Sequence, residues 1–228
     1  MKHISKIILT VTAAVFALGV IMTAVSLITG GSLRHIRDNI GISNYSEYLE
    51  ADEIREIRVE LTTGIVTFRE GENFGVAALN TAEAYFSCEV KSGVLTVKES
   101  RPQSGKFAVS RVVAAENATP QIVVFVPSGF ADPAAGTSVS VKADVGSCII
   151  SDMAFSKLRV DIGTGLTELS VPGSVFDYNI NGMVGLGTVT VGETWFRGNC
   201  NYSNENPAAG REIGFSCLAG DVKIRFSE

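Results

Sequence analysis

The stretch Val160–Val171, VDIGTGLTELSV, holds two short runs in which apolar residues take every second position, joined at Gly165. Alternation of this kind places one side of a β-strand in a core and the other side in solvent. A glycine between the runs permits a sharp change of direction that a side chain would obstruct. The stretch therefore predicts two strands joined by a tight corner.

The same pattern, a glycine with apolar residues two and four positions later, recurs along the chain. Two short strands in about twenty residues cannot bury their apolar sides alone, so stacked coils that share one core are expected. We therefore predict an all-β domain over residues 53–228, built as a parallel β-solenoid. An antiparallel β-sandwich, which also uses many short alternating strands, is the alternative. The glycines are Gly64, Gly93, Gly146, Gly165, Gly187 and Gly220.

Strands that precede the corners show the same alternation. Leu158, Val160 and Ile162 are expected to point inward before Gly165. Before Gly187, the residues expected to point inward are Phe176, Tyr178 and Ile180.

The N-terminal part of the chain contains an uncharged apolar run of 22 residues, Ile7–Ile28. As a helix it would measure about 33 Å, enough to cross a bilayer core of about 30 Å. We predict a cytoplasmic tail over residues 1–6, one transmembrane helix over 7–29 and a juxtamembrane linker over 30–52. A cleavable signal peptide remains an alternative, although its apolar run is usually about 7–15 residues long.

Charge is distributed unevenly around this segment. Lys2 and Lys6 precede it and favour a cytoplasmic N-terminus, whereas Arg34 and Arg37 follow it and favour the opposite orientation. We expect a single-pass protein of the cell membrane with the bulk of the chain extracytoplasmic, its basic flanks suiting membrane lipid. Beyond residue 37 the chain has 15 Lys and Arg against 24 Asp and Glu, a net charge of −9. Such an acidic domain is not expected to bind nucleic acid.

Catalytic and metal-binding patterns are scarce. The only histidines, His3 and His35, lie outside the predicted β domain, which excludes histidine-dependent triads and histidine-based metal centres from it. Outward acids such as Asp144, Asp161 and Asp177 could be considered for Ca²⁺, but Lys142 and Arg159 share their face, so a solvated surface of mixed charge is favoured. We predict no catalytic, cofactor-binding or metal-binding residues.

Four cysteines, Cys88, Cys148, Cys200 and Cys217, form no CxxC pair. Cys200 and Cys217 are 17 residues apart, close to one coil, which could place them on adjacent coils and join them in a disulfide. Four unpaired thiols are the alternative, with Cys148 a small buried apolar residue.

Several stretches together resemble the bacterial putative-adhesin domain family. They are IREIRVELTTGIVTF, IVVFVPSG, LRVDIGTGLTELSV and the closing GDVKIRF, and the resemblance covers most of residues 53–228. It implies a right-handed, single-stranded β-solenoid on the outside of the cell, often after a membrane segment, and it supplies no catalytic residues. The stretch Trp195–Cys217 departs from the pattern and looks like a longer loop between final coils.

The leading hypothesis for function is a membrane-anchored scaffold for binding or adhesion, without catalysis and without a cofactor. Loops at 99–119 and 198–212 would supply contacts to an unknown protein or to cell-envelope polysaccharide. The alternative is an accessory protein of envelope stress or signalling that acts through a membrane partner. Hydrolysis of envelope polysaccharide is a weaker third hypothesis, since no compact pair of acids is evident.

Overall fold

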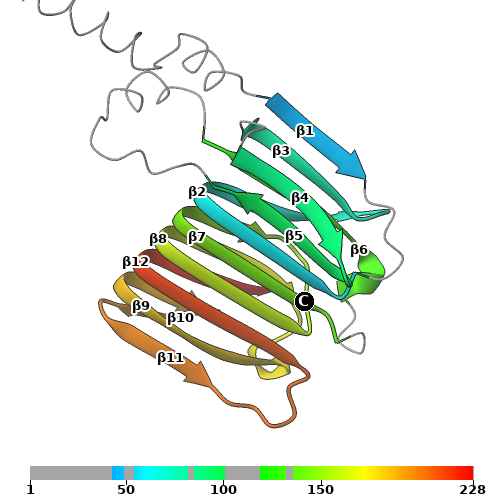
Figure 1. The fold of residues 1–228 in the computed structure, drawn as a ribbon. Helices are drawn as coiled ribbons and strands as arrows, with labels where there is room; N and C mark the ends of the chain where they lie inside the picture. Colours follow the sequence, from blue (N-terminus) through cyan, green and yellow to red (C-terminus); the bar gives the residue numbers. More distant parts are fainter. Residues whose placement is uncertain (1–42, 49–53, 82–84, 101–118, 132–135, 228) are drawn as a thin grey trace, which may run out of the picture. The chain divides into compact units, whose positions relative to one another are not determined.

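The computed structural model describes residues 43–48, 54–81, 85–100, 119–131 and 136–227, and these ranges are predominantly β-structure, which confirms the all-β prediction (Figure 1). Within them no helix has the length and apolarity that crossing a bilayer requires. The predicted transmembrane helix over 7–29 lies outside the described residues. In the described ranges, twelve strands form one mixed sheet, and the short 3₁₀ helices η2 and η4 accompany it. The elements are β1 (Ser43–Tyr48), β2 (Glu56–Gly71), β3 (Gly75–Thr81), β4 (Phe86–Lys91), β5 (Val94–Glu99), β6 (Gln121–Pro127), η2 (Ser128–Ala131), β7 (Ser138–Ile150), β8 (Lys157–Pro172), η4 (Val175–Asp177), β9 (Tyr178–Val191), β10 (Thr194–Arg197), β11 (Cys200–Asn204) and β12 (Arg211–Ser227).

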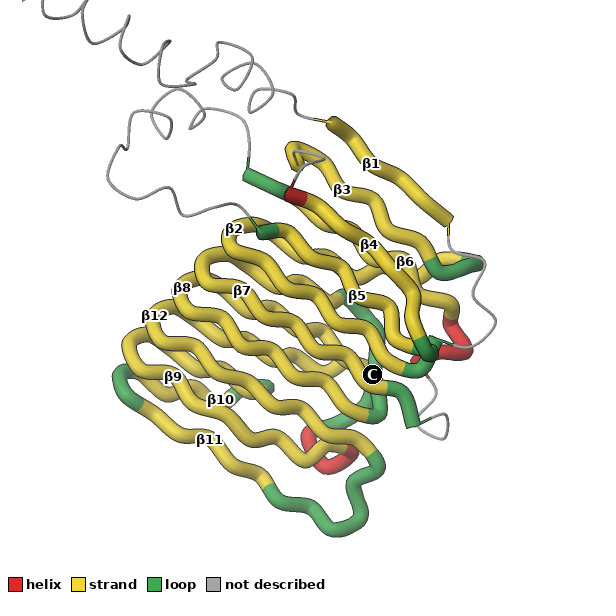
Figure 2. Tube along the Cα trace, in the orientation of Figure 1, coloured by secondary structure: helices red, strands yellow, loops and turns green. Residues whose placement is uncertain are grey.

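Five long strands make up the middle of the sheet, in the order β2, β7, β8, β12, β9, and each neighbouring pair is parallel. Each strand bends once, so that it runs along one side of the domain and returns along the other (Figures 1 and 2). The pairing of β2 shows the consequence, because Glu56–Leu61 pair with β5 whereas Ile65–Gly71 pair with β6. The strands therefore form a first layer before the bend and a second layer after it.

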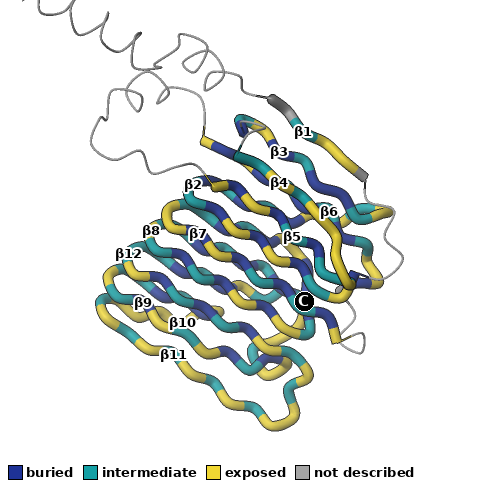
Figure 3. Tube along the Cα trace, viewed as in Figure 1, coloured by how far each residue is buried: buried dark blue, intermediate teal, exposed yellow. Residues whose placement is uncertain are grey.

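The hydrophobic core lies between the two layers and follows the alternation of the sequence. In β8, Val160 and Ile162 are buried before the bend, and Leu169 and Val171 are buried after it. Neighbouring strands keep the same register, so that Val160 pairs with Val141 of β7 and buried residues form rows across the sheet. Buried and exposed positions accordingly alternate along the strands (Figure 3).

At the bend, five glycines occupy one register position across the five strands. They are Gly64, Gly146, Gly165, Gly220 and Gly187. Their φ angles lie between +145° and +157°, a region that is almost restricted to glycine. A Cβ atom on Gly165 would lie 1.6 Å from the carbonyl oxygen of Gly146, and one on Gly187 would lie 1.7 Å from that of Gly220. The corner is thus a contact of backbone on backbone, which only glycine allows.

Two details of the predicted repeat are corrected. Gly93 is not a corner residue: with Ser92 it forms the two-residue turn between β4 and β5, where both have positive φ. Phe176 does not point inward, because it lies in η4 and is 72% exposed, whereas Tyr178 and Ile180 are buried as predicted.

The strand order differs from coils stacked in the order of the chain. β12 lies between β8 and β9 and pairs with both. Gly182 of β9 makes room for it, since a Cβ atom there would lie 2.4 Å from the ring of Phe215 on β12. The sequence did not specify this order because the repeated units share one glycine register and any two can be neighbours.

The ends of the sheet differ from its middle. One end pairs β1 with β3, β3 with β6 and β4 with β5, and the other pairs β9 with β10 and with β11, all antiparallel. The antiparallel sandwich therefore describes only the ends. β1 lies inside the range 30–52 predicted as a linker, so the sheet begins earlier in the chain than residue 53.

An aromatic pair closes the core at each end. At one end the rings of Tyr45 on β1 and Phe86 on β4 lie 4.9 Å apart. At the other, the rings of Phe196 on β10 and Tyr202 on β11 lie 6.0 Å apart. Each pair joins a strand of the first layer to a strand of the second, so the space between the layers ends at an aromatic contact.

Candidate functional site

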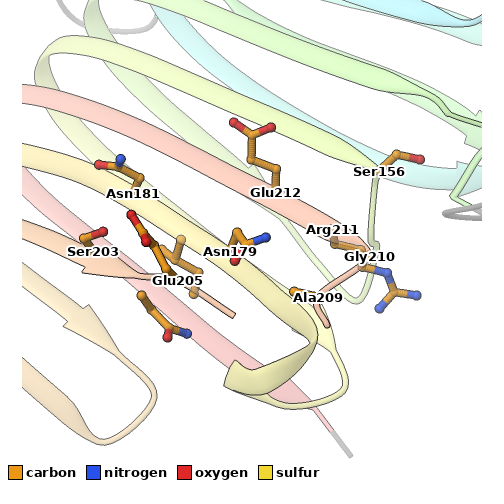
Figure 4. A pocket seen from close by; sticks show the side chains of 11 residues that line it. Ser156, Asn179, Asn181, Ser203, Glu205, Ala209, Gly210, Arg211 and Glu212 are labelled. Atoms are coloured by element: carbon orange, nitrogen blue, oxygen red, sulfur yellow. The ribbon is translucent and has the colours of Figure 1, made fainter. Parts of the chain in front are cut away.

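A groove of about 360 Å³ opens on the outer side of the first layer, between the loop after β11 and the strands β9 and β12 (Figure 4). Part of the groove comes from 198–212, one of the two loops from which contacts were predicted. That range is not all loop, because it contains β11 and the first residues of β12. Most of the other predicted loop, 99–119, lies outside the described residues. The residues that line the groove are Ser156, Asn179, Ile180, Asn181, Ser203, Asn204, Glu205, Ala209, Gly210, Arg211 and Glu212.

Asparagines hold the loop after β11 in place. The backbone N–H of Asn206 donates a hydrogen bond to Oδ1 of Asn179 at 2.7 Å, and the side-chain amide of Asn206 donates to the carbonyl of Phe176. The amide of Asn204 donates to the carbonyl of Val175 at 3.1 Å. These bonds join the end of β11 and the loop after it to η4 and to the start of β9, so protein contacts hold this wall of the groove in place.

The cationic side of the groove is already engaged. Nη1 of Arg211 donates to the hydroxyl oxygen of Tyr178 at 3.1 Å, and the guanidinium carbon lies 5.4 Å from the centre of the Tyr178 ring. The Tyr178 hydroxyl donates in turn to the carbonyl of Pro172 at 2.7 Å. Burial raises the pKa of Tyr178, against the opposing effect of the Arg211 charge. Arg211 therefore stabilises the start of β12, and its guanidinium group is already engaged by the Tyr178 side chain.

Three polar side chains of the groove remain uncommitted. Among the described residues, Asn181, Ser203 and Glu205 form no side-chain hydrogen bond or ion pair, and they lie around the same opening in Figure 4. Glu212 differs, because its carboxylate lies 2.9 Å from Nζ of Lys157. An amide, a hydroxyl and a carboxylate together offer both donors and acceptors. The free groups therefore suit a polar, uncharged or cationic ligand.

Ion pairs cover the rest of the outer side of the first layer. Each has partly exposed partners that water and salt screen, so these residues form a solvated surface and not a stabilising network. The pairs are Arg58 with Glu56 at 2.7 Å, Lys98 with Glu60 at 3.2 Å and Arg159 with Asp161 at 2.8 Å.

The acids considered for Ca²⁺ are not brought together. Asp161 pairs with Arg159, and Asp177 accepts hydrogen bonds from the backbone N–H and the hydroxyl of Ser174 at 2.7 and 3.0 Å. Asp144 is exposed at the corner of β7. Within the described part of the chain, no group of three potential metal ligands of the types His, Cys, Asp and Glu occurs.

The predicted disulfide between Cys200 and Cys217 is not formed. All four cysteines are free thiols. Cys200 on β11 and Cys217 on β12 both pair with Val184 of β9, from opposite sides. Two strand spacings of about 4.8 Å separate their backbones by roughly 10 Å, beyond the Cα–Cα limit of about 7 Å for a disulfide. The insertion of β12, which the sequence did not reveal, causes this separation.

Some groove residues were foreseen and others were not. Asn179 and Asn181 alternate with the inward residues Tyr178 and Ile180, so the alternation in the sequence places them on the outer side of β9. Ser156 and Glu212 were missed because they join the groove only through the pairing of β12 with β8. The asparagine-rich stretch 201–206, NYSNEN, was the available signal, since clustered asparagines often hydrogen-bond loop backbone.

No protein-family model and no curated protein matches the chain. Solved structures show distant similarity. One is a putative cell adhesion protein from Clostridium sporogenes ATCC 15579, 13% identical with a TM-score of 0.48, covering 82% of this chain and 100% of that one. Another is a putative adhesin from Bacteroides fragilis NCTC 9343, 11% identical with a TM-score of 0.35, covering 80% and 97%. A third is a putative lipid binding protein from Parabacteroides distasonis ATCC 8503, 13% identical with a TM-score of 0.41, covering 81% and 67%. Similarity this distant assigns neither family nor function to the chain.

Proposed function

We propose that the protein is a binding scaffold of the cell surface, anchored by a single transmembrane helix at residues 7–29, with the β domain extracytoplasmic and without catalysis. The proposal depends on the polar groove. In it, the side chains of Asn181, Ser203 and Glu205 form no hydrogen bond or ion pair with other described residues, and hydrogen bonds hold the neighbouring loop in place. Because the loop is already held in place, binding a ligand costs less conformational entropy. We interpret the in-register parallel strands as coils of a right-handed β-solenoid, interrupted by β12, which would supply this rigidity.

The ligand that fits best is a segment of cell-envelope polysaccharide without net negative charge. Neutral sugars present hydroxyls that both donate and accept hydrogen bonds, as do the amide and hydroxyl of the groove. Glu205 accepts hydrogen bonds and repels an anionic polymer. Phe176, whose backbone carbonyl accepts a hydrogen bond from Asn206, has a 72% exposed side chain that could supply an additional apolar contact.

Binding is tested with the full chain in membrane vesicles, incubated with purified cell-wall polysaccharide and sedimented through a density step. The double variant Asn181→Ala/Ser203→Ala is expected to lose about tenfold in affinity, because two hydrogen bonds are worth about 0.5–1.5 kcal/mol each. Ser140→Ala is the matched control, since Ser140 lies on the outer side of the same layer, on β7. Equal loss in both variants, or no binding by the parent chain, would contradict the proposal.

The absence of catalysis has its own test. A glycosidase needs two carboxylates in distinct roles, and Glu212 of the groove is held by Lys157. We expect no release of reducing ends from the polysaccharide in long incubations. Turnover that Glu205→Gln abolishes would show that the groove is an active site.

Membrane anchoring is tested by fractionation and N-terminal sequencing. The full chain is expected in the membrane fraction, with an intact N-terminus and with the β domain accessible to protease added outside the cell. A mature protein that starts near residues 27–32 would show instead that a signal peptide had been removed.

A further inference from the structure

Both layers of the sheet end on strands that flank β9. β11 pairs with its first half, through Ile180–Val184, and β10 pairs with its second half, through Thr188–Val191. Within the described residues no strand pairs with the outer edge of either, so each presents a row of backbone donors and acceptors. β11 is visible as the outermost strand at its end of the sheet in Figures 1 and 2.

These two edges lack the usual protection against pairing. Natural edge strands carry lysine, proline, bulges or inward charges that prevent addition of another strand. β11 contains no charged residue, and β10 contains only Arg197. At the opposite end β4 carries Glu89 and Lys91. Trp195 and Phe196 of β10 are 65% and 42% exposed, so the unprotected end is also the more apolar one.

We propose that the edges of β10 and β11 pair with the same edges of a second copy of this chain. β10 and β11 are both antiparallel to β9. A two-fold axis perpendicular to the layers therefore places β10 against β10 and β11 against β11 of the second copy, antiparallel in both layers at once. One symmetry operation thus satisfies both edges, as an isologous dimer requires.

Charge complementarity selects the register of the β10 pair. Side chains that face each other in an antiparallel pair lie on the same side of the sheet. If Trp195 faces its own copy across the axis, Thr194 faces Phe196 and Glu193 faces Arg197 of the second copy. This register forms two opposite-charge pairs and one aromatic pair.

The dimer has a consequence for binding that rests on the proposed function. Rotation about an axis perpendicular to the layers leaves both first layers facing the same way. Two grooves would then face the same surface, and a polymer that spans them would bind more tightly by avidity without any new contact.

Cysteine cross-linking tests the dimer independently of any ligand. Trp195→Cys, in a Cys88→Ser/Cys200→Ser background of the full chain in membrane vesicles, is expected to form a disulfide-linked dimer under mild oxidation. Paired Cα atoms in this register lie about 5.5 Å apart, within disulfide range. Val90→Cys on β4, at the opposite end and 39% exposed, is the matched control. The Trp195→Cys yield is expected to exceed the control at least tenfold.

Charge reversal tests the register. Added to the Trp195→Cys chain, Arg197→Glu is expected to lower the cross-linking yield about fivefold, and a further Glu193→Arg is expected to restore it. Unchanged thermal unfolding midpoints verify that the variants fold. A yield no greater than that of Val90→Cys, or cross-links to other proteins alone, would overturn the proposal. Failure of Glu193→Arg to restore the yield would overturn the register.

Discussion

Apolar residues alternate with polar ones both in the middle of the sheet and at its two ends, but the middle strands pair parallel and the end strands pair antiparallel. In the middle, parallel strands contact one another through backbone at the corner, and no side chain larger than hydrogen fits there. At the ends, hairpin strands pair antiparallel and aromatic rings close the core. The glycine positions of the corner admit no side chain, whereas the ends expose edges, side chains and a groove. Among the described residues, the glycine corner thus lies in the middle of the sheet, and the exposed edges and the groove lie near its ends.

The largest expected effect comes from adding one methyl group at the corner. Gly165→Ala would place a Cβ atom 1.6 Å from the carbonyl oxygen of Gly146, in a backbone conformation with φ of +148°. Both the overlap and the strain oppose folding, so we expect the free energy of unfolding to fall by more than about 4 kcal/mol, a large part of the roughly 5–15 kcal/mol that is typical of a domain. Chemical denaturation followed by circular dichroism measures the loss.

Gly129→Ala is the control for this variant. Gly129 lies in η2, and a Cβ atom there meets nothing within 4 Å. Its stability is expected to stay within about 0.5 kcal/mol of the parent. If both glycine variants unfolded at the same denaturant concentration, the contrast between corner and loop would be refuted.

A pair of leucines on the middle strands compares packing in the core with packing at the outer surface of the corner. Leu169 of β8 is 1% exposed in the core, and Leu186 at the corner of β9 is 72% exposed. Leu169→Ala is expected to cost about 2–5 kcal/mol through lost burial and a cavity, and Leu186→Ala less than about 0.5 kcal/mol. Urea unfolding curves of both variants measure the difference. A large cost at Leu186 would mean that the corner side chain is covered in solution.

The reactivity of two thiols, Cys148 in the middle of the sheet and Cys88 at one end, provides a chemical comparison of the two regions. Burial raises the pKa of Cys148, in the middle, to about 12, and burial with the charge of Glu47 raises that of Cys88, on β4, to about 11. At pH 8 about one Cys88 thiol in 10³ is ionised, against about one Cys148 thiol in 10⁴, and only the thiolate reacts.

Iodoacetamide labelling of the folded chain, quantified by peptide mass spectrometry, is therefore expected to modify Cys88 at least tenfold faster than Cys148. Raising the pH from 8 to 9 should increase the Cys88 rate about tenfold, since the thiolate fraction rises by that factor below the pKa. Labelling in denaturant is the control, where the two rates should converge. Rapid labelling of Cys148 in the folded chain would show that the middle opens.

The sequence predicted the features that depend on local geometry. Alternation identified the buried rows, and five of the six glycines predicted to form corners do so. Gly93 was misassigned because a hairpin turn and a corner both need positive φ, and spacing alone does not separate them. The position of β12 also could not be predicted, since it depends on the fit of Phe215 against Gly182, two residues 33 positions apart. The position of β12 between β8 and β9 accounts both for the separation of Cys200 from Cys217 and for the presence of Glu212 and Ser156 in the groove.

The smallest expected effect concerns one carboxylate near the start of β9. The backbone N–H and then the hydroxyl of Ser174 hold the pKa of Asp177 below its usual value of 3.8 by hydrogen bonds to the carboxylate. A lowered pKa in the folded state stabilises the fold above the unfolded-state pKa, and this contribution is lost as the pH falls through the folded-state pKa. The parent should thus be slightly more stable than Asp177→Asn at pH 7, and the difference should disappear as the pH falls below about 4. Urea midpoints of both chains between pH 2 and 7 measure it, with Asp144→Asn, at the exposed corner, as the control. A difference that does not change with pH would assign the effect of Asp177 to the shape of the turn and not to its charge.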